Sequence, residues 1–207
     1  MPHHVSSPAR LEAFSDGVIA VIITIMVLEL KIPRDPGLAG FLTTLPTLGV
    51  YALSFAFTGV YWINHHHLVH RTDQASERIL YANLLFLFCL SLLPFFTAYV
   101  LDKKMDAFSV LLYVLSMIVT GFSFLLLRLA IGRYLRQTGK LQREDAAAER
   151  KHWLSLLLYL IAVGFTFHHP YIALGILAAV MVLWVVPNAR FVPSVPCEPP
   201  RPLSPGI

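Results

Sequence analysis

The chain has 207 residues, of which 57% are hydrophobic and only 14% are charged, whereas a soluble domain usually carries about 25% charged residues. This composition excludes an ordinary soluble domain and predicts an integral membrane protein. The apolar runs are continuous and do not alternate with polar residues, which favours an all-α fold over a lipid-facing barrel. The net charge of +4 is explained by the distribution of basic residues among the loops, considered below. It needs no nucleic-acid partner to account for it.

Six runs are apolar enough to be membrane spans, since a helix needs roughly 20 apolar residues to cross a bilayer. We predict transmembrane helices at residues 14–31, 41–64, 79–101, 108–131, 153–168 and 171–187. The last two are separated by "FHHPYIAL", in which Pro170 favours a turn over a continuous helix.

Two segments differ in composition from these runs. Residues 139–152 are charged and rich in Ala, Glu, Arg and Lys, which predicts a solvated helical extension between the fourth and fifth spans. The chain is proline-rich at its end, which is typical of disorder. We therefore expect residues 1–190 to form one six-helix transmembrane domain and residues 191–207 to form a disordered cytoplasmic tail.

Lysine and arginine are distributed unevenly between the predicted loops. If the N terminus is inside, twelve of the 16 basic residues lie on the cytoplasmic side and four lie outside. The positive-inside rule then places both termini in the cytoplasm. We expect a multi-pass protein of the plasma membrane that contacts the lipid bilayer along its length.

The first predicted helix carries a stripe of three residues on one face. Val21, Thr24 and Leu28 follow the spacing that brings side chains together on a helix. One interpretation is that the Thr24 hydroxyl bonds back to the carbonyl of residue 20. The other is that the stripe lines a pore, in which Val21 and Leu28 are constrictions and Thr24 supplies a ring of oxygens.

The same helix opens with charged and polar residues. Asp16 precedes Val21 by five residues, which is about 140° around a helix, so it should point into the protein. A carboxylate in a membrane is costly unless it is paired. Arg10 is the nearest candidate partner. With Ser15, these residues predict a buried or interfacial structural network.

The start of this helix resembles a known family. The pattern R-x-x-x-F-S-D resembles the motif of the lysosomal/endosomal potassium channel family, in its shorter prokaryotic form. The segments "YWINHHHLVH" and "LYANLLFLFCLSLLPFFTAYV" look like the second and third helices of that family. The residues that carry the resemblance are Arg10, Phe14, Ser15, Asp16, Trp62, His65 and Asn83.

This resemblance implies a passive, potassium-permeable channel without a Gly-Tyr-Gly filter, with modest selectivity over Na⁺ and no cofactor. In the family the first helices line the pore, and the implied pore positions here are Val21, Thr24 and Leu28. One helix cannot enclose a pore. Animal members of the family have two repeats per chain and pair as dimers, so the resemblance implies that a single-repeat chain forms a homotetramer with cyclic symmetry. The permeant partners would be K⁺ and other monovalent cations. Val21 is smaller than the Ile or Leu expected there, which would give a wider pore.

Other groups leave alternatives open. Glu29 could attract cations at the outer mouth, although a solvated helix end is the simpler interpretation. The histidines of "HHHLVH" could hold a metal in a membrane enzyme, but no helix brings carboxylates alongside at ligand spacing. We expect no metal and no enzyme activity, and we expect His65 to bond into the network of Asp16 and Arg10. A secondary transporter would usually show inverted repeats, and none is apparent.

Overall fold

The computed structural model describes residues 7–185, apart from the side chains of residues 143 and 144. All regular structure within this range is helical. The helices are α1 (Pro8–Met26) with a 3₁₀ turn η1 (Val27–Glu29), α2 (Gly37–Leu42), α3 (Leu45–Val69), α4 (Glu77–Ser91), α5 (Leu93–Asp102), α6 (Ala107–Gln137), α7 (Arg143–Phe165) and α8 (Pro170–Val185).

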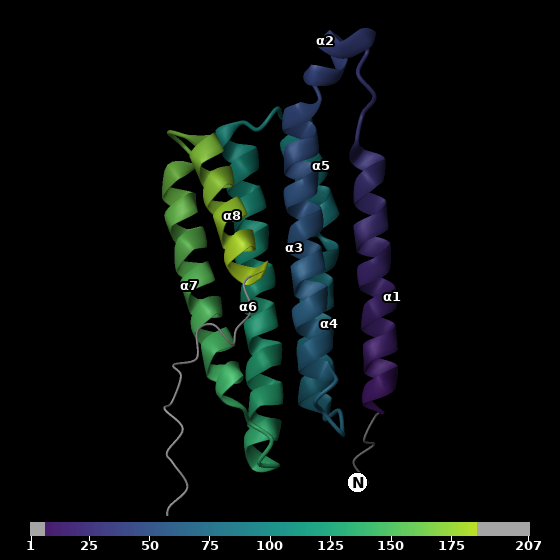
Figure 1. The fold of residues 1–207 in the computed structure, drawn as a ribbon, viewed down its shortest axis with the longest axis vertical. Coiled ribbons are helices and arrows are strands. Elements are labelled where there is room, and N and C mark those ends of the chain that lie inside the picture. Colours follow the sequence, from purple (N-terminus) through teal and green to yellow (C-terminus); the bar gives the residue numbers. More distant parts are fainter. Residues whose placement is uncertain (1–6, 186–207) are drawn as a thin grey trace, which may run out of the picture.

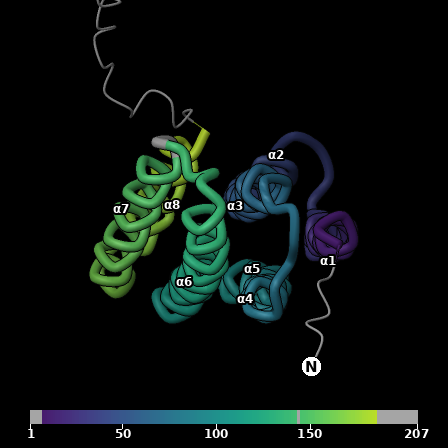
Figure 2. Tube along the Cα trace, turned by 90° about the horizontal axis from the view of Figure 1, so that it is seen from below, coloured from purple at the N-terminus to yellow at the C-terminus, as the bar shows by residue number. Residues whose placement is uncertain are grey.

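The long helices stand side by side, with α1 at one edge of the chain and α7 at the other (Figure 1). Viewed along the helices, α3 and the pair α4 and α5 lie between α1 and α6 (Figure 2). The helix α6 packs against α3, α4, α5, α7 and α8, whereas α1 packs mainly against α3, α4 and α5. One side of α1 therefore has no neighbour within the described part of the chain.

Four helical segments are long and apolar enough to cross a membrane. They are Pro8–Glu29, Leu45–Val69, Glu77–Asp102 and Ala107–Gln137, and they coincide with the first four predicted spans. The helix α8 is apolar but shorter than these four segments. The first three turns of α7 are rich in charged residues. Among the described residues, four spans are thus supported by length and composition, against the six that the sequence predicted.

The third span is broken rather than continuous. Helix α4 ends at Ser91 and α5 begins at Leu93, with Pro94 in the first turn of α5. Proline has no backbone N–H to donate and its ring clashes with the carbonyl of the preceding turn. The break near Leu92 is the direct result.

The prediction of a solvated extension over residues 139–152 is wrong in its second half. Ala148 and His152 are buried, with 1% and 2% of their surface exposed, because this part of α7 packs on α6. The His152 Nε2 lies 2.7 Å from the carbonyl oxygen of Gly121, a close approach that the small residue on α6 permits. The predicted disordered tail at residues 191–207 lies outside the described residues.

Candidate functional site

Helix α1 has one buried face and one exposed face. The buried side chains recur every three or four residues and pack toward α3 and α4; they are Leu11, Ser15, Ile19, Ile22 and Met26. At 3.6 residues per turn, the stripe of Val21, Thr24 and Leu28 is centred about 150° from this buried face. The structure therefore separates the two faces as the helical spacing predicted.

The exposed stripe is strongly apolar apart from one hydroxyl. Val21 and Leu28 are 55% and 78% exposed, and Thr24 is exposed between them. Because α1 lies at the edge of the chain (Figure 2), no other helix within residues 7–185 covers the stripe. In a membrane such a face contacts lipid, another protein chain, or the water of a pore that several chains enclose.

The Thr24 hydroxyl bonds to the backbone of its own helix. Its Oγ1 lies 2.9 Å from the carbonyl oxygen of Ala20 and 3.0 Å from that of Val21. The hydroxyl proton is thus donated within α1, as the first sequence interpretation expected. A hydroxyl oxygen also has two lone pairs, and these remain available as acceptors on the exposed face. The two interpretations of Thr24 are therefore compatible with each other.

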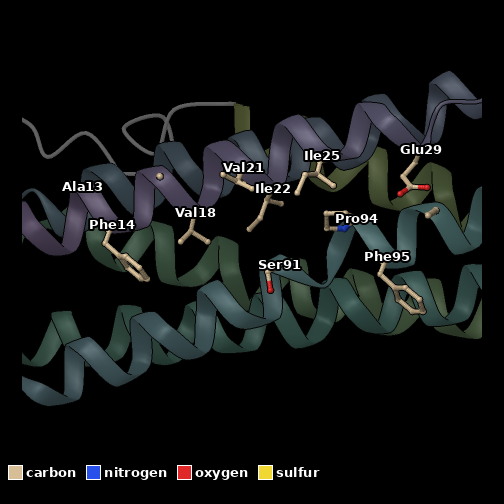
Figure 3. A pocket seen from close by; sticks show the side chains of 12 residues that line it. Ala13, Phe14, Val18, Val21, Ile22, Ile25, Glu29, Ser91, Pro94 and Phe95 are labelled. Carbon is tan, nitrogen blue, oxygen red and sulfur yellow. The ribbon is translucent and has the colours of Figure 1, made fainter.

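An apolar cavity of about 780 Å³ lies beside this stripe, between α1 and the α4–α5 break. Figure 3 shows Val18, Val21 and Ile22 along one wall and Phe95 across from them. Glu29 is the one ionisable residue among those that line the cavity, and it lies at the end next to η1. The cavity is a surface groove of the single chain, next to the exposed face of α1.

A buried polar cluster fixes the opposite face of α1. Asn83 on α4 donates through Nδ2 to the Ser15 Oγ at 2.9 Å, and its Oδ1 lies 2.7 Å from the His65 Nε2 on α3. All three side chains are fully buried. The cluster therefore ties α1, α3 and α4 together, and buried hydrogen bonds of this kind set the relative position of membrane helices.

A second cluster lies on a neighbouring side of α1, around Glu12 and Asp16. The Trp62 indole Nε1 donates to the Asp16 carboxylate at 2.9 Å. Glu12, one turn before Asp16, lies 2.7 Å from the Nδ1 of His66, and the ring of His66 stacks near that of Trp62. These contacts join the first turns of α1 to the end of α3.

The structure divides the predicted network in two. The expected bond of His65 to the Asp16 network is wrong, because His65 contacts Asn83 and lies in the buried cluster. Arg10 and Phe14 are exposed, and within residues 7–185 Arg10 makes no ion pair with Asp16. Membrane carboxylates need partners, and here an indole N–H fills that role.

Sequence reasoning missed the contact between Glu12 and His66. The available signal was the spacing of Glu12 and Asp16, which places both acids on one side of α1. His66 and His70 have the same spacing, at the end of α3 and directly after it. His70 Nδ1 lies 3.9 Å from Glu12. Within the described part of the chain, no group of three or more His, Cys, Asp or Glu side chains is arranged to hold a metal ion.

Comparisons with known proteins identify relatives of this chain. The family model described as the endosomal/lysosomal potassium channel TMEM175 matches residues 10–94. A protein named as a potassium channel in Chryseobacterium sp. is 38% identical over 186 residues, covering 90% of this chain and 96% of that protein. The chain belongs to the TMEM175 family. A potassium channel of Streptomyces collinus is 31% identical over 172 residues, covering 76% of this TMEM175 chain and 82% of the relative.

A solved structure shows the same fold. The crystal structure of a lysosomal potassium-selective channel TMEM175 homolog from Chamaesiphon minutus superposes with a TM-score of 0.76 at 24% identity, covering 87% of this chain and 97% of the other. The matched family region, residues 10–94, runs from α1 to the start of α5. It contains both polar clusters and the exposed stripe of this TMEM175 chain, which is a multi-pass membrane protein of a channel family.

Proposed function

We propose that this TMEM175 chain is a potassium-permeable cation channel that assembles as a homotetramer. In this proposal α1 of each copy lines a central pore, Val21 and Leu28 form the narrow points, and Thr24 supplies a ring of oxygens between them. Helices α7 and α8 are the fifth and sixth spans, and both termini are cytoplasmic in the plasma membrane. The channel needs no cofactor and no catalytic residue.

The observation that carries the proposal is the exposed stripe on α1. Helix α1 has two opposed faces. Within the described part of the chain, α3 and α4 cover its buried face and leave the stripe exposed. Lipid would cover an apolar face well, but it would gain nothing from the Thr24 hydroxyl in the middle of it. A ring of hydroxyl oxygens between two apolar constrictions is an arrangement that suits a partly dehydrated cation.

The groove beside α1 supports assembly through the same edge of the chain. Its walls are apolar and it opens next to the stripe, so a neighbouring copy can cover it while leaving the stripe toward a central axis. Cyclic symmetry would then place four Glu29 carboxylates near one mouth, where their potential attracts cations. Apolar rings gate by dewetting, so conduction should be slow and selectivity modest.

The test is the reversal potential of the purified chain in a planar bilayer, with K⁺ on one side and Na⁺ on the other. We expect a current that reverses on the potassium-selective side. Thr24→Ala should lower the potassium-to-sodium permeability ratio by about fivefold, the effect of losing roughly 1 kcal/mol of ligand energy. Thr24→Ser keeps the hydroxyl and should retain the ratio.

Thr58 on α3 offers a matched control. Its hydroxyl also bonds back to its own helix, at 3.0 Å from the Ser54 carbonyl, but it is buried away from the stripe. Thr58→Ala should therefore leave the permeability ratio unchanged. Equal effects of the two alanine variants would refute the pore assignment. If a tetrameric preparation carries no current but a proton gradient drives ion uptake, the chain is a secondary transporter and not a channel.

A further inference from the structure

A second cavity lies between the start of α4 and the end of α6. These helix ends lie at the end of the bundle that also holds the start of α1 (Figure 1). Its volume is about 540 Å³, within the range of ligand pockets in general. It is separate from the groove beside α1 and shares no lining residue with it. It therefore needs an explanation other than the ion path.

Two arginines without an acidic partner in the described part of the chain line this cavity. Arg78 belongs to the first turn of α4 and Arg133 to the last two turns of α6. Within residues 7–185, neither guanidinium takes part in a hydrogen bond or an ion pair. At the same end of the bundle, Arg71 is held by Asp145 and Lys140 by Asp73. Arg78 and Arg133 therefore differ from Arg71 and Lys140, because no acidic side chain pairs with them in the described part of the chain.

The start of α4 adds further donors to the cavity. Ser76 is the N-cap of α4, and its side chain makes no capping hydrogen bond, so amides of the first turn have no partner in the helix. Ser76, Glu77 and Arg78 all line the cavity. Helix N-termini favour anions such as phosphate. Glu77 is the one acidic residue in the lining, and it offsets one of the two arginine charges.

The wall of the cavity becomes apolar toward the middle of α6. Leu126 and Leu129 line it and are 37% and 38% exposed. They lie one to two turns from Arg133, on the side of α6 that leads into the membrane span. A free phosphate in water would gain nothing from this apolar wall. A phospholipid would use both parts, because its headgroup is charged and its acyl chains are apolar.

We propose that the α4–α6 cavity binds an anionic phospholipid, with Arg78 and Arg133 on the phosphate and Leu126 and Leu129 against the acyl chains. Basic pockets between membrane helices on the cytoplasmic side suit anionic headgroups. The planar guanidinium can bind a phosphate through two parallel hydrogen bonds. A lipid bound here contacts both α4, which carries Asn83, and the central helix α6. It therefore stabilises the packing of the helices that position α1.

The test is a binding titration of the full chain in detergent, read by native mass spectrometry. The probes are dioleoylphosphatidylglycerol, dioleoylphosphatidylcholine and glycerol 3-phosphate. We expect the anionic lipid to bind more tightly than the zwitterionic lipid, and glycerol 3-phosphate to bind far more weakly than the anionic lipid. Equal binding of the two lipids, or binding of glycerol 3-phosphate as tight as that of the anionic lipid, would overturn the proposal.

Charge-matched variants separate this cavity from general attraction to the membrane surface. The double variant R78Q/R133Q should weaken binding of the anionic lipid by about thirtyfold, since each arginine near an anionic surface contributes about fivefold. The control R136Q/R150Q removes two exposed arginines that do not line this cavity, and it should weaken binding by less than about threefold, because those charges act only at long range. Equal losses in the two double variants would overturn the assignment.

Single variants keep the test decisive if the double variant does not fold. R78Q and R133Q should each weaken binding by about fivefold. Leu129→Trp should do the same by filling the apolar wall while keeping both charges. A lipid affinity unchanged in all three variants would overturn the proposal. The measurement does not involve ion flux, so its result is independent of the proposed channel function.

Discussion

Replacing Asn83 with alanine should loosen the attachment of α1 to the rest of the chain. Asn83 is fully buried on α4 and contacts Ser15 on α1 and His65 on α3. The change removes both of these interhelical hydrogen bonds at once. It also leaves the His65 ring without a hydrogen-bond partner, because its Nδ1 already has none among the described residues.

The size of the effect can be worked out from these contacts. Hydrogen bonds between membrane helices contribute about 0.6 kcal/mol on average and up to about 1.7 kcal/mol, so the two lost here account for roughly 1–3 kcal/mol. A buried donor left unpaired costs about 1–3 kcal/mol more. Ser15 keeps its own bond to the Leu11 carbonyl at 2.8 Å and adds nothing. We expect Asn83→Ala to reduce the unfolding free energy by about 3 kcal/mol.

Asn64 provides a matched control on α3. Its Nδ2 donates to the Val60 carbonyl of the same helix at 2.7 Å, so Asn64→Ala breaks no hydrogen bond between helices and should cost no more than about 1 kcal/mol. Both variants are compared with the parent chain by following tryptophan fluorescence during unfolding in mixed micelles of a mild detergent and dodecyl sulfate. If Asn83→Ala costs no more than Asn64→Ala, the polar cluster does not hold α1.

Two further predictions concern α7 and its contact with α6. Burial by itself would raise the pKa of Asp145, but hydrogen bonds from Arg71 and from the Gln142 amide outweigh it and hold the pKa below its ordinary value. The ionised carboxylate therefore stabilises the start of α7 above about pH 4, and this stabilisation is lost as the pH falls further. Proteolysis of the α6–α7 turn should be faster at that lower pH, and Asp145→Asn should show the faster proteolysis already at neutral pH. An Asp145→Asn variant that resists proteolysis as well as the parent chain would contradict the prediction. Gly121→Val should destabilise the chain by about 1–3 kcal/mol, since even its Cβ would lie 3.2 Å from a tyrosine hydroxyl; Gly132→Val, which meets no atom within 4 Å, should be tolerated, and equal thermal stabilities of the two variants would contradict the packing argument.

The membrane class, the first four spans and the two faces of α1 could be predicted from the sequence. Each depends on local properties, because hydrophobic length decides whether a helix crosses a bilayer and a helical repeat decides which side chains share a face. For this reason the helical repeat by itself separates Val21, Thr24 and Leu28 from Ser15. The family motif added the role of the stripe, which spacing alone left open.

The tertiary structure decided which polar groups meet. Whether His65 contacts Asp16 or Asn83 depends on the rotation and vertical offset of α3 against α1 and α4, and no single helix encodes these. The same holds for the burial of His152 against α6. It also holds for the cavity in which Arg78 and Arg133 lie together although 55 residues separate them. The donor–acceptor distance of a hydrogen bond can vary by only a few tenths of an ångström. Which polar groups become partners is therefore decided only when all the helices have packed.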